Sequence, residues 1–235
     1  MTTKLFLSTA AALFAGALAA QAADLPYRGP PRAPAYLPPT VYNWSGLYIG
    51  VNGGGGFGKS NHTDTLLGVA TGDFDVSGGL VGGTVGFNYQ VGAWVWGLEG
   101  DIDWSNVKGT SGAFVTAQGL TTYESELRWL STFRGRLGYA WDRVLPYVTG
   151  GLAMGSVRGT VSNPVGVFTG TETQVGWTLG AGVEYAVTPN VSIKGEYLYV
   201  DLGTATPINQ DSIEFTTHVV RAGLNWKFDW GGARY

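Results

Sequence analysis

Hydrophobic and polar residues alternate with a period of two over most of the chain after residue 42. Successive side chains of an extended strand point to opposite faces of a sheet, so this period predicts β-strands and argues against helices. Eight segments carry the pattern: Trp44–Gly58, Ser77–Gln90, Trp94–Trp104, Ser125–Ala140, Leu145–Gly155, Gln174–Ala186, Val191–Val200 and Ile213–Phe228. The chain is therefore expected to form an all-β fold with eight strands.

The connections between these segments alternate in length. Three of them are tight turns, at residues 91–93, 141–144 and 187–190. The other four are long: Lys59–Val76, Ser105–Glu124, Ser156–Thr173 and Asp201–Ser212. In an up-and-down meander the long connections all lie at one end of the sheet and the tight turns at the other. This asymmetry is typical of transmembrane β-barrels, which have short periplasmic turns and longer extracellular loops.

The two faces of the predicted strands differ in chemistry. One face is almost purely apolar, and its aromatic residues gather near the strand ends: Trp94, Trp96, Trp104, Trp129, Tyr139, Trp177, Tyr185, Tyr197, Tyr199, Trp226 and Phe228. The other face carries six acids and six bases: Glu99, Asp101, Asp103, Glu126, Glu184, Glu196, Arg128, Arg134, Arg136, Lys194, Arg221 and Lys227. The interior of an eight-stranded barrel is just wide enough for side chains to fill it, so these many rings cannot all fit inside.

We therefore interpret the pattern as an inside-out barrel. The chain is expected to form a transmembrane eight-stranded antiparallel up-and-down β-barrel with four long extracellular loops and three short periplasmic turns. The aromatic residues would form two lipid-facing girdles, one near each membrane interface. The twelve charged residues would pair in a neutral salt-bridge network that plugs the lumen, because an unpaired charge in such an interior is costly.

The composition agrees with this interpretation. Charged residues make up 13% of the 235 residues, about half the share in an ordinary soluble domain, and 38 residues are glycine. Glycine inside a strand relieves crowding in a tightly curved barrel. The chain has no cysteine, which excludes disulfides, iron–sulfur clusters and thiolate zinc sites. With 14 basic against 17 acidic residues, there is no excess of positive charge to hold a nucleic acid.

The N-terminal residues have the pattern of an export signal. Lys4 precedes the uncharged stretch Leu5–Ala20, and Ala20-Gln21-Ala22 supplies small residues at the spacing that a signal peptidase reads. Prolines crowd the segment that follows and favour an extended tether. The expected organisation is a signal peptide at residues 1–22, a Pro-rich periplasmic tether at 23–43, an outer-membrane barrel at 44–228 and a C-terminal extension at 229–235.

Five short motifs resemble those of a known family: Asn43-Trp44-Ser45-Gly46-Leu47-Tyr48-Ile49-Gly50, Gly97-Leu98-Glu99-Gly100-Asp101, Arg134-Gly135-Arg136-Leu137-Gly138-Tyr139, Leu145-Pro146-Tyr147-Val148-Thr149-Gly150-Gly151 and Val220-Arg221-Ala222-Gly223-Leu224-Asn225-Trp226. Together they are similar to the small outer-membrane β-barrel proteins of alphaproteobacteria of the rhizobial and Brucella type, often labelled the porin family and related in architecture to OmpA and OmpX. The resemblance implies a place in the outer membrane of a Gram-negative bacterium. It also implies membrane lipid, lipopolysaccharide and the barrel-assembly machinery as partners.

The chain departs from this family at its C-terminal end. Members usually stop at an aromatic residue that closes the last strand and is thought to be read during assembly. Here the residues from Asp229 to Tyr235 follow Phe228. Either Trp226 and Phe228 still serve this purpose internally, or Tyr235 is the signal.

For function, the residues favour a structural protein of the envelope over an enzyme. His218 falls on the apolar face with Val220 two positions on, so no nucleophile accompanies it and no catalytic residue is assigned. No cofactor or metal is expected, and His62 in the first long connection is the candidate for a haem ligand. We expect the protein to stabilise the envelope and to display its loops. Two alternatives stay open: a low-conductance channel for small solutes, and a loop-mediated receptor for haem or a host surface.

Overall fold

The computed structural model describes residues 42–64, 69–70, 72–116, 119–208 and 211–228. Within these ranges no helix is long and apolar enough to cross a membrane. The strands are β1 (Gly46–Asp64), β2 (Val69–Ala70), β3 (Phe74–Val91), β4 (Trp94–Thr110), β5 (Phe114–Thr116), β6 (Gly119–Tyr139), β7 (Val144–Asn163), β8 (Gly166–Ala186), β9 (Val191–Ile208) and β10 (Asp211–Lys227).

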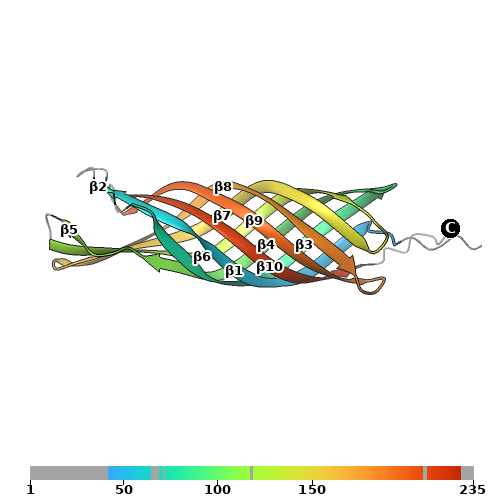
Figure 1. Ribbon diagram of the computed structural model, residues 1–235, viewed down its shortest axis with the longest axis horizontal. Helices are drawn as coiled ribbons and strands as arrows, with labels where there is room; N and C mark the ends of the chain where they lie inside the picture. Colours follow the sequence, from blue (N-terminus) through green and yellow to red (C-terminus); the bar gives the residue numbers. More distant parts are fainter. Residues whose placement is uncertain (1–41, 65–68, 71, 117–118, 209–210, 229–235) are drawn as a thin grey trace, which may run out of the picture. The chain divides into compact units, whose positions relative to one another are not determined.

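Eight long strands close into a barrel (Figure 1). Each pairs antiparallel with its neighbours in the order β1, β3, β4, β6, β7, β8, β9 and β10, and β10 returns to pair with β1. The short strands β2 and β5 pair with β1 and β6. Closure satisfies the backbone groups within the sheet, as a membrane requires. The prediction of an eight-stranded antiparallel up-and-down barrel is confirmed.

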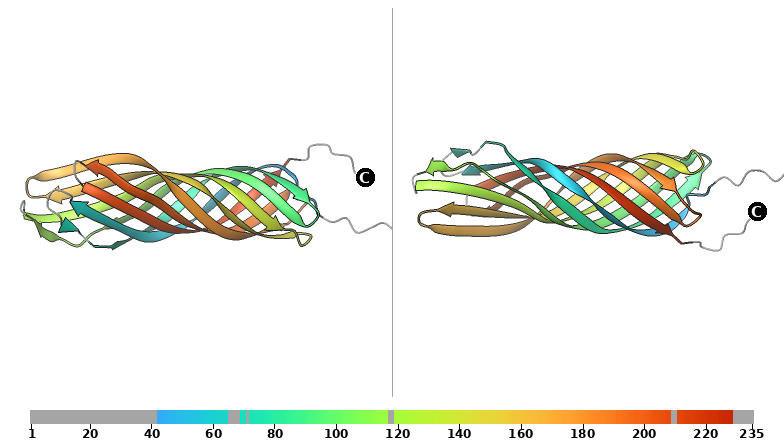
Figure 2. Two further views of the ribbon diagram at one scale, coloured as in Figure 1. Left: turned by 90° about the horizontal axis from the view of Figure 1, so that it is seen from above. Right: turned by 60° about the horizontal axis from the view of Figure 1, so that its bottom comes forward.

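The strands run farther than predicted at the end of the long connections (Figure 2). β7 and β8 pair as far as Asn163 and Gly166, so a short turn replaces most of the predicted connection Ser156–Thr173. Glycine, serine and threonine interrupt the apolar alternation in this region. The sequence pattern therefore stops early, although backbone hydrogen bonding needs no apolar face and continues.

The outer face of the barrel is the apolar one. Along β4, Trp94 and Trp96 are 52% and 57% exposed, whereas Val95 between them is fully buried and Glu99 is 2% exposed. A barrel in water would turn these rings inward and the carboxylates outward. The inside-out arrangement places the polar candidates for function in the interior.

Candidate functional site in the barrel interior

Side chains fill the barrel interior in three successive layers. At the tight-turn end lies a stopper of Trp44, Val95, Leu145 and Ala186. The middle is a charged layer of nine residues: Glu99, Asp101, Asp103, Arg134, Arg136, Glu184, Lys194, Glu196 and Arg221. Toward the long-connection end lies an apolar layer: Val76, Leu80, Val107, Leu127, Leu130, Ala153, Val157, Leu198, Val200, Leu202, Phe215 and Val219.

Arg134 holds the centre of the charged layer. Its Nη2 lies 2.5 Å from Glu99 Oε1 and 2.7 Å from Asp101 Oδ2, and its Nη1 lies 2.9 Å from Glu196 Oε1. The side chain of Arg134 is fully buried, and those of its three partners are nearly so. One guanidinium therefore bridges carboxylates from β4 and β9 across the lumen.

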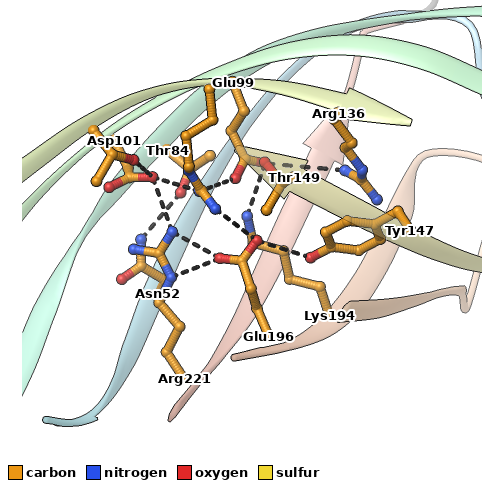
Figure 3. A network of polar contacts seen from close by, with 12 residues as sticks. Asn52, Thr84, Glu99, Asp101, Arg136, Tyr147, Thr149, Lys194, Glu196 and Arg221 are labelled. Atoms are coloured by element: carbon orange, nitrogen blue, oxygen red, sulfur yellow. Dashed lines mark hydrogen bonds and ion pairs between the residues drawn. The ribbon is translucent and has the colours of Figure 1, made fainter. Parts of the chain in front are cut away.

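Arg221 and Lys194 extend the network on the opposite wall (Figure 3). Arg221 reaches Asp101 at 2.8 Å, Asp103 at 2.6 Å and Glu196 at 2.8 Å. Lys194 Nζ lies 2.8 Å from Glu99 Oε2. Glu99 and Asp101 of β4 are thus each shared between cations of two strands that are far apart in sequence, whereas Asp103 pairs with Arg221.

Arg136 joins the charged layer to tyrosines near the stopper. It pairs with Glu184. Its guanidinium carbon also lies 3.7 Å from the centre of the Tyr147 ring (Figure 3). The Tyr48 hydroxyl donates to Glu99 Oε2 at 2.7 Å, and that of Tyr147 donates to Glu196 Oε1 at 3.1 Å. These hydroxyls give further hydrogen bonds to the buried carboxylates, which such groups need when they leave water.

Strand register explains why this layer forms. Positions two apart on one strand share a face, and opposite charges meet directly across neighbouring strands. Glu99 lies opposite Arg134, Glu196 opposite Arg221 and Glu184 opposite Lys194. The layer holds five carboxylates and four cations, so its formal charge is −1. The expectation of a neutral network of twelve residues is therefore corrected to a network of nine of them.

Arg128 is placed on the outside, contrary to expectation. A β-bulge inserts it into β6, because Leu127 lies opposite Val157 of β7 while Trp129 lies opposite the adjacent Ser156. An inserted residue reverses which face the following residues occupy. Arg128 is exposed, and Leu127 turns inward to full burial although the sequence pattern put it on the lipid face.

Glu126 and Lys227 also lie outside the charged layer. Glu126 faces Arg158 at 4.0 Å, and the two side chains are 31% and 41% exposed. Lys227 contacts the backbone oxygen of Asn43, and its Nζ lies 4.4 Å from the centre of the Tyr42 ring. Both residues sit near a barrel end rather than in its centre.

The sequence analysis did not predict the apolar layer, although the sequence of β9 indicates part of it. Leu198 and Val200 alternate with the outward Tyr197 and Tyr199, so β9 is apolar on both faces at this level. Val107 and Leu127 give no such signal, since register shifts in β4 and β6 decide their direction. These residues are fully buried and exclude water from this section of the lumen.

The stopper takes its largest side chain, Trp44, from the first described residues of the chain. Trp44 is 2% exposed, and its indole Nε1 donates to the backbone oxygen of Asp142 at 3.0 Å. Its backbone nitrogen donates to Gln90 Oε1 at 2.8 Å, and the Tyr42 hydroxyl donates to the Pro189 oxygen at 3.2 Å. The chain therefore enters the barrel across the three tight turns. The predicted signal peptide, most of the predicted tether and the C-terminal extension lie outside the described residues.

The predicted girdle residues all lie on the outer face of the barrel. Nine are exposed, and Trp129 and Tyr199 are half-buried against neighbouring side chains. Ten residues separate the rings of Trp94 and Trp104 along β4, which at ~3.3 Å per residue and ~45° tilt correspond to about 23 Å along the barrel axis. An outer-membrane barrel carries an apolar band about 25 Å tall. Contact of these girdles with lipid stays a prediction.

The structure describes the side chain of His218 but not that of His62. The His218 ring hydrogen-bonds through Nδ1 to the Tyr197 hydroxyl at 2.6 Å and stacks on Phe57 with centroids 5.5 Å apart. It thus belongs to the girdle at the long-connection end, which also contains Trp104, Trp129, Tyr197 and Tyr199 and which we call the outer aromatic band. The backbone of His62 pairs with Ile213 in β1 and β10, but its side chain lies outside the described part of the chain. Haem binding and the absence of catalysis both stay predictions.

Comparison with known proteins places this geometry in context. The chain matches the family model described as "Outer membrane protein beta-barrel domain" over residues 8–228. It is 39% identical over 240 residues to the 31 kDa outer-membrane immunogenic protein of Brucella melitensis, covering 94% of this chain and 98% of that protein. It is 35% identical over 193 residues to the 22 kDa outer membrane protein of Rhizobium leguminosarum bv. viciae, covering 79% of each. The crystal structure of the outer membrane protease OmpT from Escherichia coli matches with a TM-score of 0.53 at 12% identity, covering 80% of this chain and 98% of that one, which shows a shared fold alone.

Proposed function

Because the chain belongs to the outer membrane protein β-barrel domain family, whose Brucella and Rhizobium members are outer-membrane proteins, we propose that it is a structural component of the outer membrane that contributes to envelope integrity. The resemblance carried by its motifs is confirmed, and so is the outer membrane as its location. In this proposal the barrel anchors the chain, the lumen stays closed, and the long-connection end is displayed at the cell surface.

The filling of the lumen is the observation that carries the proposal. Each of the three layers contains side chains with no exposed surface: Val95 in the stopper, Arg134 in the charged layer and Leu130 in the apolar layer. A conducting barrel needs an aqueous path through its centre, and larger barrels provide one because their interiors are wider. An ion crossing this lumen would have to displace the buried network or leave water for the apolar layer, and both are costly.

Surface display is supported by the length of the strands. β7 and β8 each continue well past the outer aromatic band, and β8 pairs with β9 only between Trp177 and Ala186. The hairpin of β7 and β8 carries the exposed Val165, Val167 and Phe168 near its tip. The Brucella relative is named an immunogenic protein, which agrees with a surface position for the corresponding end. We further propose that membrane lipid surrounds the girdles and that the assembly machinery reads an aromatic signal, either Trp226 and Phe228 or Tyr235.

Conductance tests the closed lumen. The refolded protein, inserted in planar bilayers in molar salt, is expected to give no steady openings, because its three layers leave no continuous column of water. Single-channel recording is the measurement, with a large trimeric porin inserted in the same bilayers as the positive control. Steady nanosiemens openings would refute the closed lumen, and steady smaller openings would favour the alternative of a low-conductance channel.

Deletion of the gene tests the structural role. Cells that lack the protein are expected to become more sensitive to detergent and to release more outer-membrane vesicles. Expression of the wild-type chain should restore both properties. Minimal inhibitory detergent concentration and vesicle yield are the readouts. A deletion strain that matches its parent in both would argue against a contribution to envelope integrity.

A further inference from the structure

The outer part of β8 has a neighbouring strand on one side only. β8 pairs with β7 as far as Gly166, at the tip of the hairpin that the two strands form. Its pairing with β9, in contrast, begins at Trp177. In the described part of the chain, residues 166–176 of β8 therefore pair with no strand on the side that faces β9. We call this section of β8 the open edge.

A bulge in β9 explains why the open edge exists. Thr216 and Glu214 of β10 are two positions apart, whereas their partners in β9, Asp201 and Thr204, are three positions apart. Gly203 lies in this bulge with a φ of +67°, and its N–H donates to Asp201 Oδ1 at 2.8 Å. A bulge bends the strand that contains it. β9 therefore leaves β8 at a defined position and continues with β10.

The open edge lacks the features that usually protect the edge of a sheet. Backbone groups at an edge attract further strands, and proteins block them with charged side chains, proline or bulges. Residues 166–176 contain one charged residue, Glu172, and no proline. Their pairing with β7 shows no register shift. Threonine and valine, which favour strands, occupy five of these eleven positions. An extended strand of another chain can therefore add to the open edge.

The outward side chains of the open edge follow the same order in both directions. They are Val167, Thr169, Thr171, Thr173 and Val175, and all five are exposed. In an antiparallel pairing of β8 with a second copy about Thr171, each valine faces a valine and each threonine faces a threonine. Cross-strand pairs of this kind stabilise a sheet. A two-fold symmetric contact requires a surface that is complementary to itself, and this sequence provides one.

Charge also favours this register. Glu172 would lie opposite Gly170 of the second copy, so like charges do not meet directly. A parallel pairing with equivalent residues side by side would place Glu172 next to Glu172 of the second copy, and like charges across two strands are destabilising. We propose that two copies of this chain associate through their open edges, which pair antiparallel in the register centred on Thr171.

The direction of the open edge decides which membranes the contact joins. The hairpin of β7 and β8 extends along the long axis of the barrel, away from the tight turns (Figure 2). Antiparallel pairing turns one copy end over end relative to the other, so the two barrels face each other from opposed membranes. Thr171 lies six positions beyond Trp177, whose ring lies 5.3 Å from that of Tyr199 in the outer aromatic band. At ~3.3 Å per residue, the two outer aromatic bands would be about 40 Å apart.

A disulfide cross-link tests the register, because the natural chain has no cysteine. Thr171→Cys, refolded in detergent micelles and oxidised, should form a covalent dimer, since position 171 lies opposite itself. Val167→Cys is the matched control. Its copies would lie ~27 Å apart along the strands, beyond the reach of a disulfide. We expect at least about tenfold more dimer from Thr171→Cys on non-reducing gels. A mixture of Val167→Cys and Val175→Cys should dimerise as Thr171→Cys does.

Clustering of lipid vesicles tests the orientation. Vesicles that contain the wild-type protein should cluster, as measured by light scattering, because open edges from two vesicles meet. Thr171→Lys should abolish clustering, since a charge on an edge strand prevents further pairing. Ser162→Lys is the control with the same change in charge. Ser162 is exposed on β7, which pairs with strands on both sides, so this variant should cluster as the wild type does.

The inference rests on the proposed display of the long-connection end, but its tests use purified protein. Their failure would therefore leave the envelope role, which gene deletion tests, unaffected. Monomeric Thr171→Cys, or equal cross-linking at positions 171 and 167, would overturn the pairing of open edges. Cross-linking without clustering of vesicles, or clustering that Thr171→Lys does not reduce, would overturn the contact between opposed membranes. Heat-modifiable gel migration verifies that each variant is a folded barrel.

Discussion

Replacing Arg134 by methionine is expected to lower the free energy of unfolding by about 3–5 kcal/mol, the range found when one partner of a buried ion pair is removed. Arg134 is fully buried and contacts Glu99, Asp101 and Glu196 at 2.5 to 2.9 Å. Methionine fills similar space but leaves three carboxylates close together with one cation fewer. Urea titration of the refolded protein in lipid vesicles, followed by tryptophan fluorescence, measures the change.

Lys59→Met is the matched control for this prediction. Lys59 also pairs with an acid, Asp73 at 3.4 Å, but the two side chains are 62% and 53% exposed. Exposed pairs contribute between about 0 and 1 kcal/mol, so this change should have little effect. If Arg134→Met cost less than about 1 kcal/mol, water would be solvating the carboxylates, and the closed lumen proposed above would be wrong.

Gly151→Ala is expected to lower the free energy of unfolding by about 3 kcal/mol. A methyl group there would lie 2.1 Å from the Phe133 backbone oxygen and 2.8 Å from Arg134 Cα. Both atoms belong to the neighbouring strand backbone and cannot rotate away, so β6 and β7 would have to move apart beside the charged layer. The same urea titration measures the decrease in the free energy of unfolding. The variant should also change its gel migration at a lower temperature than the wild type does.

Gly135→Ala provides the control on the partner strand. Gly135 lies opposite Gly150 on the outer face, and its added methyl would meet nothing closer than a backbone oxygen at 3.9 Å. Its effect should stay within about 0.5 kcal/mol in either direction, because lost backbone freedom in the unfolded chain offsets small changes in packing. Equal effects at the two positions would mean that crowding between strands does not explain the need for glycine at position 151.

Much of the fold follows from the sequence because the evidence for it is local. Alternation along β4 separates Trp94 and Trp96 from Glu99 without any knowledge of neighbouring strands. The number of rings on one face then decides which face can be inside, since an eight-stranded barrel has little interior space. Strand number, direction and the inside-out arrangement are all available at this stage.

The candidate site is only partly predictable, because local alternation decides the direction of some of its side chains but not of others. Charged residues on regular stretches, such as Glu99 and Arg134, lie on the inner face that their alternation predicts, because no bulge separates them from the tight turn between β3 and β4 or β6 and β7. The alternation of inward and outward side chains is interrupted at the bulge in β6. Arg128 therefore lies on the outer face and Leu127 on the inner face, the reverse of what the sequence pattern predicts. The ends of the strands are also not predicted correctly, because β7 and β8 continue to pair where the sequence has no alternating apolar residues.

The sequence by itself therefore determines that this chain is an eight-stranded barrel with its apolar face outward. The tertiary structure alone decides that the interior has three layers, that Trp44 closes the tight-turn end, and that Arg128 lies on the outer face. Alternation is a property of one strand, whereas a bulge depends on register between two strands and a filled lumen depends on closure of all eight.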